Sequence, residues 1–420
     1  MIFINAFGER VNDMREYNEF DLWDIFYIHE ERTSQHIHEH MKKHPKVEYS
    51  IKKRCLIKIK RLVLDTIWKF AYDSTKKSIL MSGPRLGYVC EGLKKDYNLY
   101  LLNANSALEG KKYMRRSIKA CPTDLWRNEF YCAFEKHDEK RLRKVYNKIA
   151  NLLKKYNVQI VIISDFATFV NRLIGKVAKE NGIPVVKYEH GALVTGTMSE
   201  ALKKEAIGER KFFDYLWTWS TKNKEAYLKL GVGNGENTIV MGYPYQLPQV
   251  KKKEKRAMFV GEVIEPEHME EYYSIVNNIY GIMNSLGLEM IYANHPKENP
   301  DVLKRYLNAG IAVVSGRLYQ ELERNLIVIG ARTTAVLEAG LYRCITIQMV
   351  MDSLNLGGHV FGNAYVAGNY DEFKEIIVSI QNGAITYKPI DPYFLEMPDD
   401  ITDKISGEIE QLLLKQMNNS

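Results

Sequence analysis

The sequence predicts an α/β protein built from two Rossmann-like doubly wound domains that face each other across a cleft. Along most of the chain, short apolar runs alternate with segments of helical periodicity, a pattern typical of parallel sheets covered by helices. A chain of 420 residues is too long for one ordinary core, so two domains of roughly 200 residues are expected. A polar, charged run at 249–256 divides the alternating pattern, as a linker between domains would.

The first domain is expected to cover residues 1–248, as a Rossmann-like domain with a helical insertion. Its predicted strands are 78–81, 98–103, 158–163, 185–188, 215–220 and 238–241. The predicted helices 86–95 and 168–181 join neighbouring strands as βαβ units. Residues 107–156 are predicted to form a long, polar, helix-rich insertion that ends in a basic amphipathic segment.

The second domain is expected to cover residues 249–420 and to be Rossmann-like as well. Its predicted strands are 257–260, 288–292, 311–314, 326–329 and 344–348. Its predicted helices are 266–286, 298–308, 317–323, 333–341 and 370–382. A last helix at 401–417 could pack back on the first domain.

Charge and composition limit the partners. The 59 Lys and Arg against 52 Asp and Glu give +7, a mild excess that suits a phosphorylated ligand or an anionic membrane surface but does not indicate nucleic acid. The five cysteines form no C-x-x-C pair and are expected to be reduced thiols. No apolar run approaches the ~20 residues that cross a bilayer, and residues 1–5 look like a first strand and not a signal peptide. The protein is therefore expected in the cytoplasm, or peripherally on the inner face of the membrane.

Three predicted strands run into polar residues suited to catalysis. The strand at 185–188 is followed directly by Glu189 and His190, and the strands at 288–292 and 326–329 also lead to polar side chains. Open α/β sheets bind their ligands at the carboxyl ends of the strands. Because these three ends are divided between two predicted domains, an active site between the domains is expected.

Glu189 and His190 are the predicted proton-transfer groups. Either could take the proton from an attacking hydroxyl, since partial burial can tune either group toward neutral pH. Successive side chains of an extended strand point in opposite directions, so only one of the two is expected to face the cleft. Glu189 is preferred as the base because a dry cleft raises the pKa of a carboxylate. The alternative is a surface turn in which neither residue has a role.

A phosphorylated ligand is expected at the ends of the second-domain strands. His295 could donate to one of its phosphate oxygens, and Pro296 fixes the backbone after it. The paired hydroxyls of Thr333 and Thr334 lie where a strand gives way to a helix, whose free amides and dipole favour an anion. Thr333 could instead serve only as the helix N-cap.

Further binding residues follow from position alone. Arg332 precedes the paired hydroxyls and adds a positive charge, and Gly261 could let the backbone approach a phosphate. Arg85 and Asp165 follow first-domain strands and could bind the acceptor. The histidines between 36 and 44 are spaced so that neighbours lie on different helix faces, and the chain has no Asp-x-Asp motif. No metal and no other cofactor is expected.

These motifs resemble those of GT-B glycosyltransferases that build bacterial surface polysaccharides, a group that includes sialyl- and polysialyltransferases and teichoic-acid polymerases. The resemblance covers about residues 158–348 and rests on four short motifs: Glu189-His190-Gly191, Gly242-Tyr243-Pro244, His295-Pro296 and Thr333-Thr334. Polysialyltransferases carry two acidic residues before the glycine of the first motif, and teichoic-acid polymerases carry His-Gly there. Glu338 resembles the glutamate with which many GT-B enzymes hold ribose or sugar hydroxyls of the donor.

The resemblance implies a metal-independent, inverting glycosyltransferase that uses a nucleotide-activated sugar, CMP-linked donors included, to extend a capsular or other surface polysaccharide or a glycolipid. The acceptor would be a glycan or a lipid-linked sugar. A CDP-polyol phosphotransferase of the teichoic-acid type and a non-catalytic nucleotide- or glycan-binding subunit are the alternatives. An epimerase of the same two-domain shape is less favoured, because the acidic cluster that such enzymes use around the sugar is not evident in the sequence.

The segment 51–72 bears on membrane contact. It places several lysines and an arginine among leucines, isoleucines and aromatic residues. A basic amphipathic helix of this kind can lie in the interface of an inner membrane. It can equally pack its apolar side into the first domain and leave its charges in water.

Overall fold

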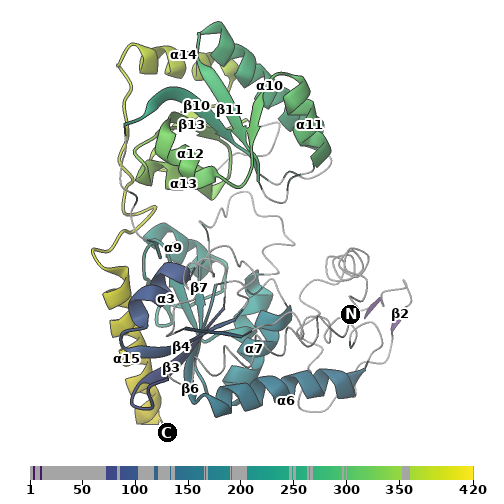
Figure 1. Ribbon diagram of the computed structural model, residues 1–420, viewed down its shortest axis with the longest axis vertical. Coiled ribbons are helices and arrows are strands. Elements are labelled where there is room, and N and C mark those ends of the chain that lie inside the picture. Colours follow the sequence, from purple (N-terminus) through teal and green to yellow (C-terminus); the bar gives the residue numbers. More distant parts are fainter. Residues whose placement is uncertain are drawn as a thin grey trace.

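The fold is that of a computed structural model (Figure 1). The structure describes residues 3–4, 10–11, 72–82, 86–102, 118–121, 133, 138–164, 166, 169–189, 191, 206–245, 248, 252–262, 264, 268–295, 298, 300–351 and 360–419. Most of it forms two α/β units, one from each half of the chain. A two-stranded antiparallel pair of β1 (Phe3–Ile4) and β2 (Arg10–Val11) lies at the N-terminus.

The first unit is a seven-stranded sheet in the order β5-β4-β3-β6-β7-β8-β9, and every pairing in it is parallel. Its strands are β3 (Lys77–Ser82), β4 (Tyr97–Leu102), β5 (Ile118–Cys121), β6 (Val158–Ile163), β7 (Val185–Tyr188), β8 (Tyr215–Thr218) and β9 (Thr238–Val240). The central strands are nearly all apolar because helices cover both faces of the sheet.

The helices of the first unit are α3 (Gly87–Leu93), α6 (Glu139–Lys155), α7 (Phe169–Glu180) and α9 (Thr221–Lys229), with a short 3₁₀ turn, η3 (Arg210–Phe212). Side chains from α6 and α7 join one hydrophobic cluster with alternate residues of β3 and β6, including Leu80 and Val161. The intervening residues, including Ile79 and Ile162, join a second cluster on the opposite face with α3. Because successive side chains of a strand point to opposite faces, this one sheet contributes to two hydrophobic cores.

The second unit is a six-stranded parallel sheet in the order β12-β11-β10-β13-β14-β15. Its strands are β10 (Glu254–Val260), β11 (Glu289–Ala293), β12 (Ala312–Val314), β13 (Asn325–Gly330), β14 (Ile345–Met349) and β15 (Ala364–Ala367). Its helices are α10 (Met269–Ser285), α11 (Pro300–Asn308), α12 (Leu318–Arg324), α13 (Thr334–Leu341) and α14 (Tyr370–Gln381). One face packs on α10, α11 and α14, and the other on α12 and α13.

Both sheets have the Rossmann strand order. When strands are counted within each unit, the order is 3-2-1-4-5-6 in both, and the first sheet adds a seventh strand at its edge. The prediction of two doubly wound domains is therefore confirmed. Each sheet has a switch point where the order reverses, between β3 and β6 in the first and between β10 and β13 in the second.

Three details differ from the sequence expectations. β5 lies inside the segment expected to be a helical insertion, and β15 was not expected at all. Both are four-residue strands at the edge of a sheet, and each pairs with only one other strand. Their apolar runs are therefore too short to stand out in the sequence. The expected linker at 249–256 ends in β10, whose first residues are exposed. The helix expected at 51–72 lies outside the described residues.

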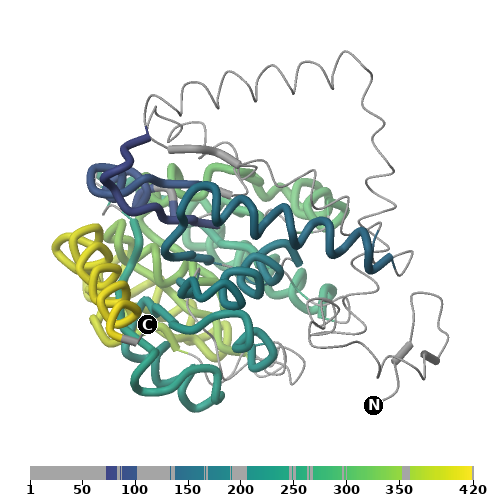
Figure 2. Tube along the Cα trace, turned by 90° about the horizontal axis from the view of Figure 1, so that it is seen from below, coloured from purple at the N-terminus to yellow at the C-terminus, as the bar shows by residue number. Residues whose placement is uncertain are grey.

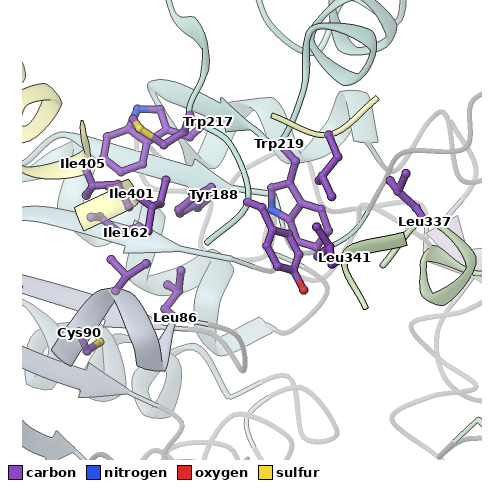
Figure 3. Packing of buried hydrophobic residues seen from close by; sticks show 14 of the residues in the cluster. Leu86, Cys90, Ile162, Tyr188, Trp217, Trp219, Leu337, Leu341, Ile401 and Ile405 are labelled. Atoms are coloured by element: carbon purple, nitrogen blue, oxygen red, sulfur yellow. The ribbon is translucent and has the colours of Figure 1, made fainter. Parts of the chain in front are cut away.

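The last helix, α15 (Ile401–Asn419), lies against the first unit, beside α3 and β6 (Figures 1 and 2). Figure 3 shows Ile401 and Ile405 beside Ile162. The hydroxyl of Tyr97 donates to the Glu410 carboxylate at 2.8 Å. Because α15 follows the whole second unit in sequence, the chain returns to the first unit to complete its core. No helix in the described part of the chain is long and apolar enough to cross a membrane.

The return path is the segment 382–400, here called the crossing segment (Figure 1). Leu395 is fully buried within it. The Lys222 amide donates to the Tyr393 carbonyl at 3.0 Å, and the Glu396 amide donates to the Trp219 carbonyl at 3.0 Å. These bonds fix the crossing segment on the first unit near the end of β8.

Replacing Ile405 by Ala should lower the free energy of unfolding by about 2–5 kcal/mol, because the side chain is fully buried in the cluster that α15 shares with α3. Leu414→Ala on the same helix is the matched control, since Leu414 is 56% exposed and its loss should cost less than about 0.5 kcal/mol. Urea unfolding followed by circular dichroism measures both. Equal effects would mean that this face of α15 does not stabilise the fold.

Candidate functional site

The candidate site lies at the carboxyl ends of the second-sheet strands, around the switch point between β10 and β13. Phe259 pairs with Ile329, so the residues that follow these two strands, Gly261 and Ala331, lie side by side. The predicted donor residues follow β10, β11 and β13, which are neighbours in the sheet. The strand order therefore brings together residues that are far apart in the sequence.

Gly261 is closely surrounded by protein atoms. A Cβ at this position would overlap the Tyr292 hydroxyl and would lie 2.7 Å from a carboxylate oxygen of Glu298. The Gly261 amide donates to the Ala293 carbonyl at 2.8 Å. Packing inside the unit is thus sufficient reason for glycine here, in addition to the predicted approach of a phosphate.

Arg332 contributes the positive charge of the site. Its Nε lies 3.6 Å from a carboxylate oxygen of Glu262, the buried residue that follows Gly261. The Arg332 side chain is one-fifth exposed, so the ion pair orients it while part of it remains accessible. Glu262 was not predicted as a site residue, because it belongs to none of the sequence motifs.

Thr333 and Thr334 begin α13, as predicted. Thr333 is the N-cap, and its side chain accepts a long hydrogen bond of 3.3 Å from the Ala335 amide. The residues of α13 after Thr334 are all buried, so its dipole and first amides lie in a protected environment. Thr333 therefore caps the helix, because its side chain and its carbonyl accept from the Ala335 and Val336 amides. The positive end of the helix dipole remains suited to an anion.

Gln348 supports this helix start and was missed by sequence reasoning. Its buried amide group donates to the Ala331 carbonyl at 2.9 Å and accepts from the Phe361 amide at 2.9 Å. The bond to Ala331 fixes the backbone directly before Arg332. A glutamine at the end of an apolar strand, in the run Ile345–Met349, was the only signal available.

Gly191 brings the first-domain motif to the second-domain site. A Cβ built on Gly191 would lie 3.3 Å from the Thr334 hydroxyl oxygen. The residues after β7 and the start of α13 are thus in near contact across the two units. This is the contact that joins the two halves of the predicted site.

Glu189 is directed into the protein. It is 2% exposed, and its carboxylate accepts from the Trp219 amide at 2.7 Å and from the Asn223 side chain at 2.9 Å. One carboxylate oxygen therefore has a donor from the turn after β8 and the other has a donor from the first turn of α9. Its partner in the predicted pair, His190, lies outside the described residues.

His295 is half-buried at the end of β11, and its backbone is held on both sides. Its amide donates to a carboxylate oxygen of Glu298 at 3.0 Å, and its carbonyl accepts from the Asn294 side chain at 3.1 Å. Burial raises the pKa of Glu298, while hydrogen bonds from Tyr292 and the His295 amide oppose that rise. Glu298 was not predicted. An acidic residue three positions after a strand end is a weak signal for such a turn.

Glu338 is buried within α13 at 1% exposure. One carboxylate oxygen accepts from the Tyr243 hydroxyl at 3.0 Å, and the other lies 3.4 Å from the Tyr319 hydroxyl. Tyr243 belongs to the Gly-Tyr-Pro motif at the end of the first unit. Glu338, which was expected to hold the donor, thus makes a contact between the two units.

The remaining predicted residues, Arg85, Asp165 and Pro296, lie outside the described residues. Near the switch point of the first sheet, the Ser82 hydroxyl donates to the Asn171 side chain at 2.7 Å, and both residues are buried. Among the described residues, no group of His, Cys, Asp or Glu side chains is placed to hold a metal ion.

Comparisons with known proteins find the fold among solved structures. Neither protein-family models nor curated protein sequences match this chain. The S. aureus MnaA–UDP co-structure is 12% identical with a TM-score of 0.55, over 80% of this chain and 97% of that chain. UDP-GlcNAc 2-epimerase from Methanocaldococcus jannaschii, in complex with UDP-GlcNAc and UDP, is 14% identical with a TM-score of 0.51, over 80% and 99%. Anabaena Alr3699/HepE in complex with UDP and glucose is 11% identical with a TM-score of 0.52, over 80% and 99%.

At such identities the likeness shows the fold alone. The fold is the GT-B type of two Rossmann-like domains, and the alignments span nearly the full length of the matched chains. Several of the similar structures are UDP-GlcNAc 2-epimerases and not polysialyltransferases. The resemblance drawn from the sequence motifs is therefore supported at the level of the GT-B fold, and no finer than that.

Proposed function

We propose that the protein is a metal-independent glycosyltransferase that binds a nucleotide-activated sugar on its second domain and transfers the sugar to an acceptor on its first. The observation that carries the proposal is the approach of Gly191 to Thr334, which brings the polar end of β7 to the anion-binding start of α13. A transferase needs donor and acceptor groups to meet in this way across two domains. The similar structures in complex with UDP, with UDP-GlcNAc and UDP, and with UDP and glucose support a nucleotide-sugar ligand.

The donor phosphates would lie at the start of α13. Arg332 and the positive end of the α13 dipole offset their charge, and the Thr334 hydroxyl adds a donor. His295 would donate to the phosphate oxygen that keeps the electron pair when the bond to the sugar carbon breaks. Its backbone bonds to Glu298 and Asn294 hold it in one place, as such stabilisation requires.

His190 is the base that this proposal favours. The sequence alone favours Glu189 as the base. In the structure, however, both carboxylate oxygens of Glu189 accept hydrogen bonds from the protein, which suits a positioning role. His190 would take the proton of the acceptor hydroxyl while that oxygen attacks the sugar carbon and the nucleotide leaves with inversion. A glycan or lipid-linked acceptor of a surface polysaccharide, with contacts to Arg85 and Asp165, completes the proposal.

An epimerase is the second candidate, because several similar structures are UDP-GlcNAc 2-epimerases. Epimerisation needs acid and base groups around the sugar itself. Among the described residues that directly follow first-sheet strands, Glu189 is the only carboxylate, and it is committed to Trp219 and Asn223. This arrangement favours transfer.

Product analysis separates the candidates. The protein is incubated with UDP-GlcNAc and with CMP-, CDP- and GDP-linked donors, with and without a glycan acceptor, and products are identified by NMR. A new glycosidic bond with release of nucleotide supports the proposal. A 2-epimer formed without acceptor would establish the epimerase, a phosphodiester product would establish the polyol-phosphate transferase, and binding without turnover would establish a binding subunit.

Thr334→Val should weaken binding of the nucleotide diphosphate by about tenfold and leave thermal stability nearly unchanged, because it removes a hydroxyl donor to a charged group. Thr333→Val should also lower stability by about 1 kcal/mol, since Thr333 caps α13. Thr221→Val is the matched control, because Thr221 likewise follows a hydroxyl N-cap at the start of α9. Calorimetric titration and thermal unfolding measure both quantities. Unchanged affinity in Thr334→Val would remove α13 from the phosphate site.

Glu189→Gln should retain substantial transfer, because the side-chain carbonyl oxygen of glutamine can still accept from the Trp219 amide. His190→Gln should abolish transfer, because it removes the proposed base. Glu189→Ala should lower the free energy of unfolding by about 1–3 kcal/mol, since it leaves a buried amide unsatisfied. Initial transfer rates at saturating donor, with binding checked separately, measure the first effect. Loss of transfer in Glu189→Gln with intact donor binding would restore Glu189 as the base.

A further inference from the structure

The carboxylate of Glu338 is occupied by two tyrosine hydroxyls, one from each domain. Tyr243, after the last strand of the first sheet, donates to one oxygen at 3.0 Å. Tyr319, on α12 of the second domain, lies 3.4 Å from the other. Each carboxylate oxygen thus has one tyrosine hydroxyl beside it, and the Glu338 side chain is buried.

Tyr243 is presented to Glu338 by a rigid part of the first domain. Gly242 has a φ of +104°, a conformation that favours glycine, and its carbonyl accepts from the Tyr188 hydroxyl at 2.9 Å. The Tyr243 amide donates to the Glu396 carbonyl at 2.8 Å. The Tyr243 ring packs edge-on against Trp219, with ring centroids 5.1 Å apart. The position of this hydroxyl is therefore set by the first domain and by the crossing segment.

Glu338 lies on the same helix as the proposed phosphate site. Four residues separate it from Thr334, which puts the two side chains on the same helix face with a rise of about 6 Å between them. That span is comparable to the one between the phosphates and the ribose hydroxyls of a nucleotide. A carboxylate oxygen at this distance can accept from a ribose hydroxyl, as it now accepts from the Tyr243 hydroxyl.

We propose that the Tyr243 hydroxyl is an internal substitute for a ribose hydroxyl. In this structure it occupies one oxygen of Glu338, and a ribose hydroxyl of the incoming nucleotide takes its place. This inference rests on the proposed nucleotide site and adds to it a group within the protein that competes with the nucleotide for Glu338. Because Tyr243 and Glu338 belong to different domains, binding of the donor breaks a contact between them and frees the second domain to move relative to the first.

The exchange is physically balanced. One neutral hydroxyl donor replaces another on the same oxygen, so the number of hydrogen bonds to the carboxylate is conserved. Burial raises the pKa of Tyr243 far above its ordinary value, and the charge of Glu338 adds to that rise, so the hydroxyl keeps its proton and remains a donor at any working pH. The tyrosine therefore competes with the nucleotide for one acceptor.

The test is the Tyr243→Phe variant, which keeps the ring and removes the competing hydroxyl. Its affinity for UDP should rise by about tenfold over wild type in calorimetric titration, because the ribose no longer displaces a hydrogen bond. The affinity for 2′,3′-dideoxyuridine diphosphate should not change. Tyr342→Phe is the matched control, since Tyr342 stacks on Tyr319 but donates no hydrogen bond to Glu338. Equal or weaker UDP binding by Tyr243→Phe, or an equal gain with the dideoxy nucleotide, would overturn the inference.

A second measurement needs no nucleotide. Without ligand, amide hydrogen exchange at residues 240–245 should be faster in Tyr243→Phe than in wild type or Tyr342→Phe, because the contact between the domains is lost. Unchanged amide hydrogen exchange in Tyr243→Phe would mean that the Tyr243 hydroxyl does not hold the two domains together. If wild type binds none of the donor nucleotides while exchange does change, the proposed function fails and the contact stands. Binding of UDP by Tyr243→Phe alone would support the inference directly.

Discussion

The hydrogen bonds of the Trp219 backbone are the interactions on which much of the site depends. Its amide donates to Glu189, its carbonyl accepts from Glu396 of the crossing segment, and its ring packs on Tyr243. Three parts of the chain that are distant in sequence, the end of β7, the return path to α15 and the contact with α13, are thus fixed to one residue. A disturbance at the domain crossing would reach the end of β7 through this one residue, with no need for a longer chain of contacts.

The strand order determines where chemistry can occur in this fold. All strands of each sheet run in the same direction, so each strand contributes its following residues to the same edge. The second sheet brings Gly261, His295 and Arg332 to that edge, although they are separated by tens of residues in the chain. The first sheet contributes Glu189 and Gly191. The contact of Gly191 with Thr334 then requires that the two edges face each other.

The sequence was sufficient to predict the sheets but not the directions of the side chains. The apolar run 158–163 coincides with β6, because a strand buried on both faces has a continuous signal. The short edge strands β5 and β15 lacked that signal. The partners of Glu189 are 30 and 34 residues away, and Tyr243 is 95 residues from Glu338. No local sequence pattern indicates such distant partners. The sequence could therefore place a glutamate at the end of a strand, but it could not show whether the side chain points into the cleft or into the core.

Three glutamates near the site share one feature that changes how it is understood. Glu189, Glu298 and Glu338 each accept hydrogen bonds from the protein on both carboxylate oxygens. A buried carboxylate is costly unless its oxygens are satisfied in this way, and once satisfied it holds its donors in fixed positions. The bonded groups are the start of α9 with the turn before it, the backbone of His295 and the contact between the domains. Negative charge in this site therefore organises the scaffold, and the groups left to meet the phosphates of a donor are imidazole, guanidinium, hydroxyl and backbone amide, all of which suit an anion. Among the three, Glu338 alone would exchange one of its donors for a ribose hydroxyl.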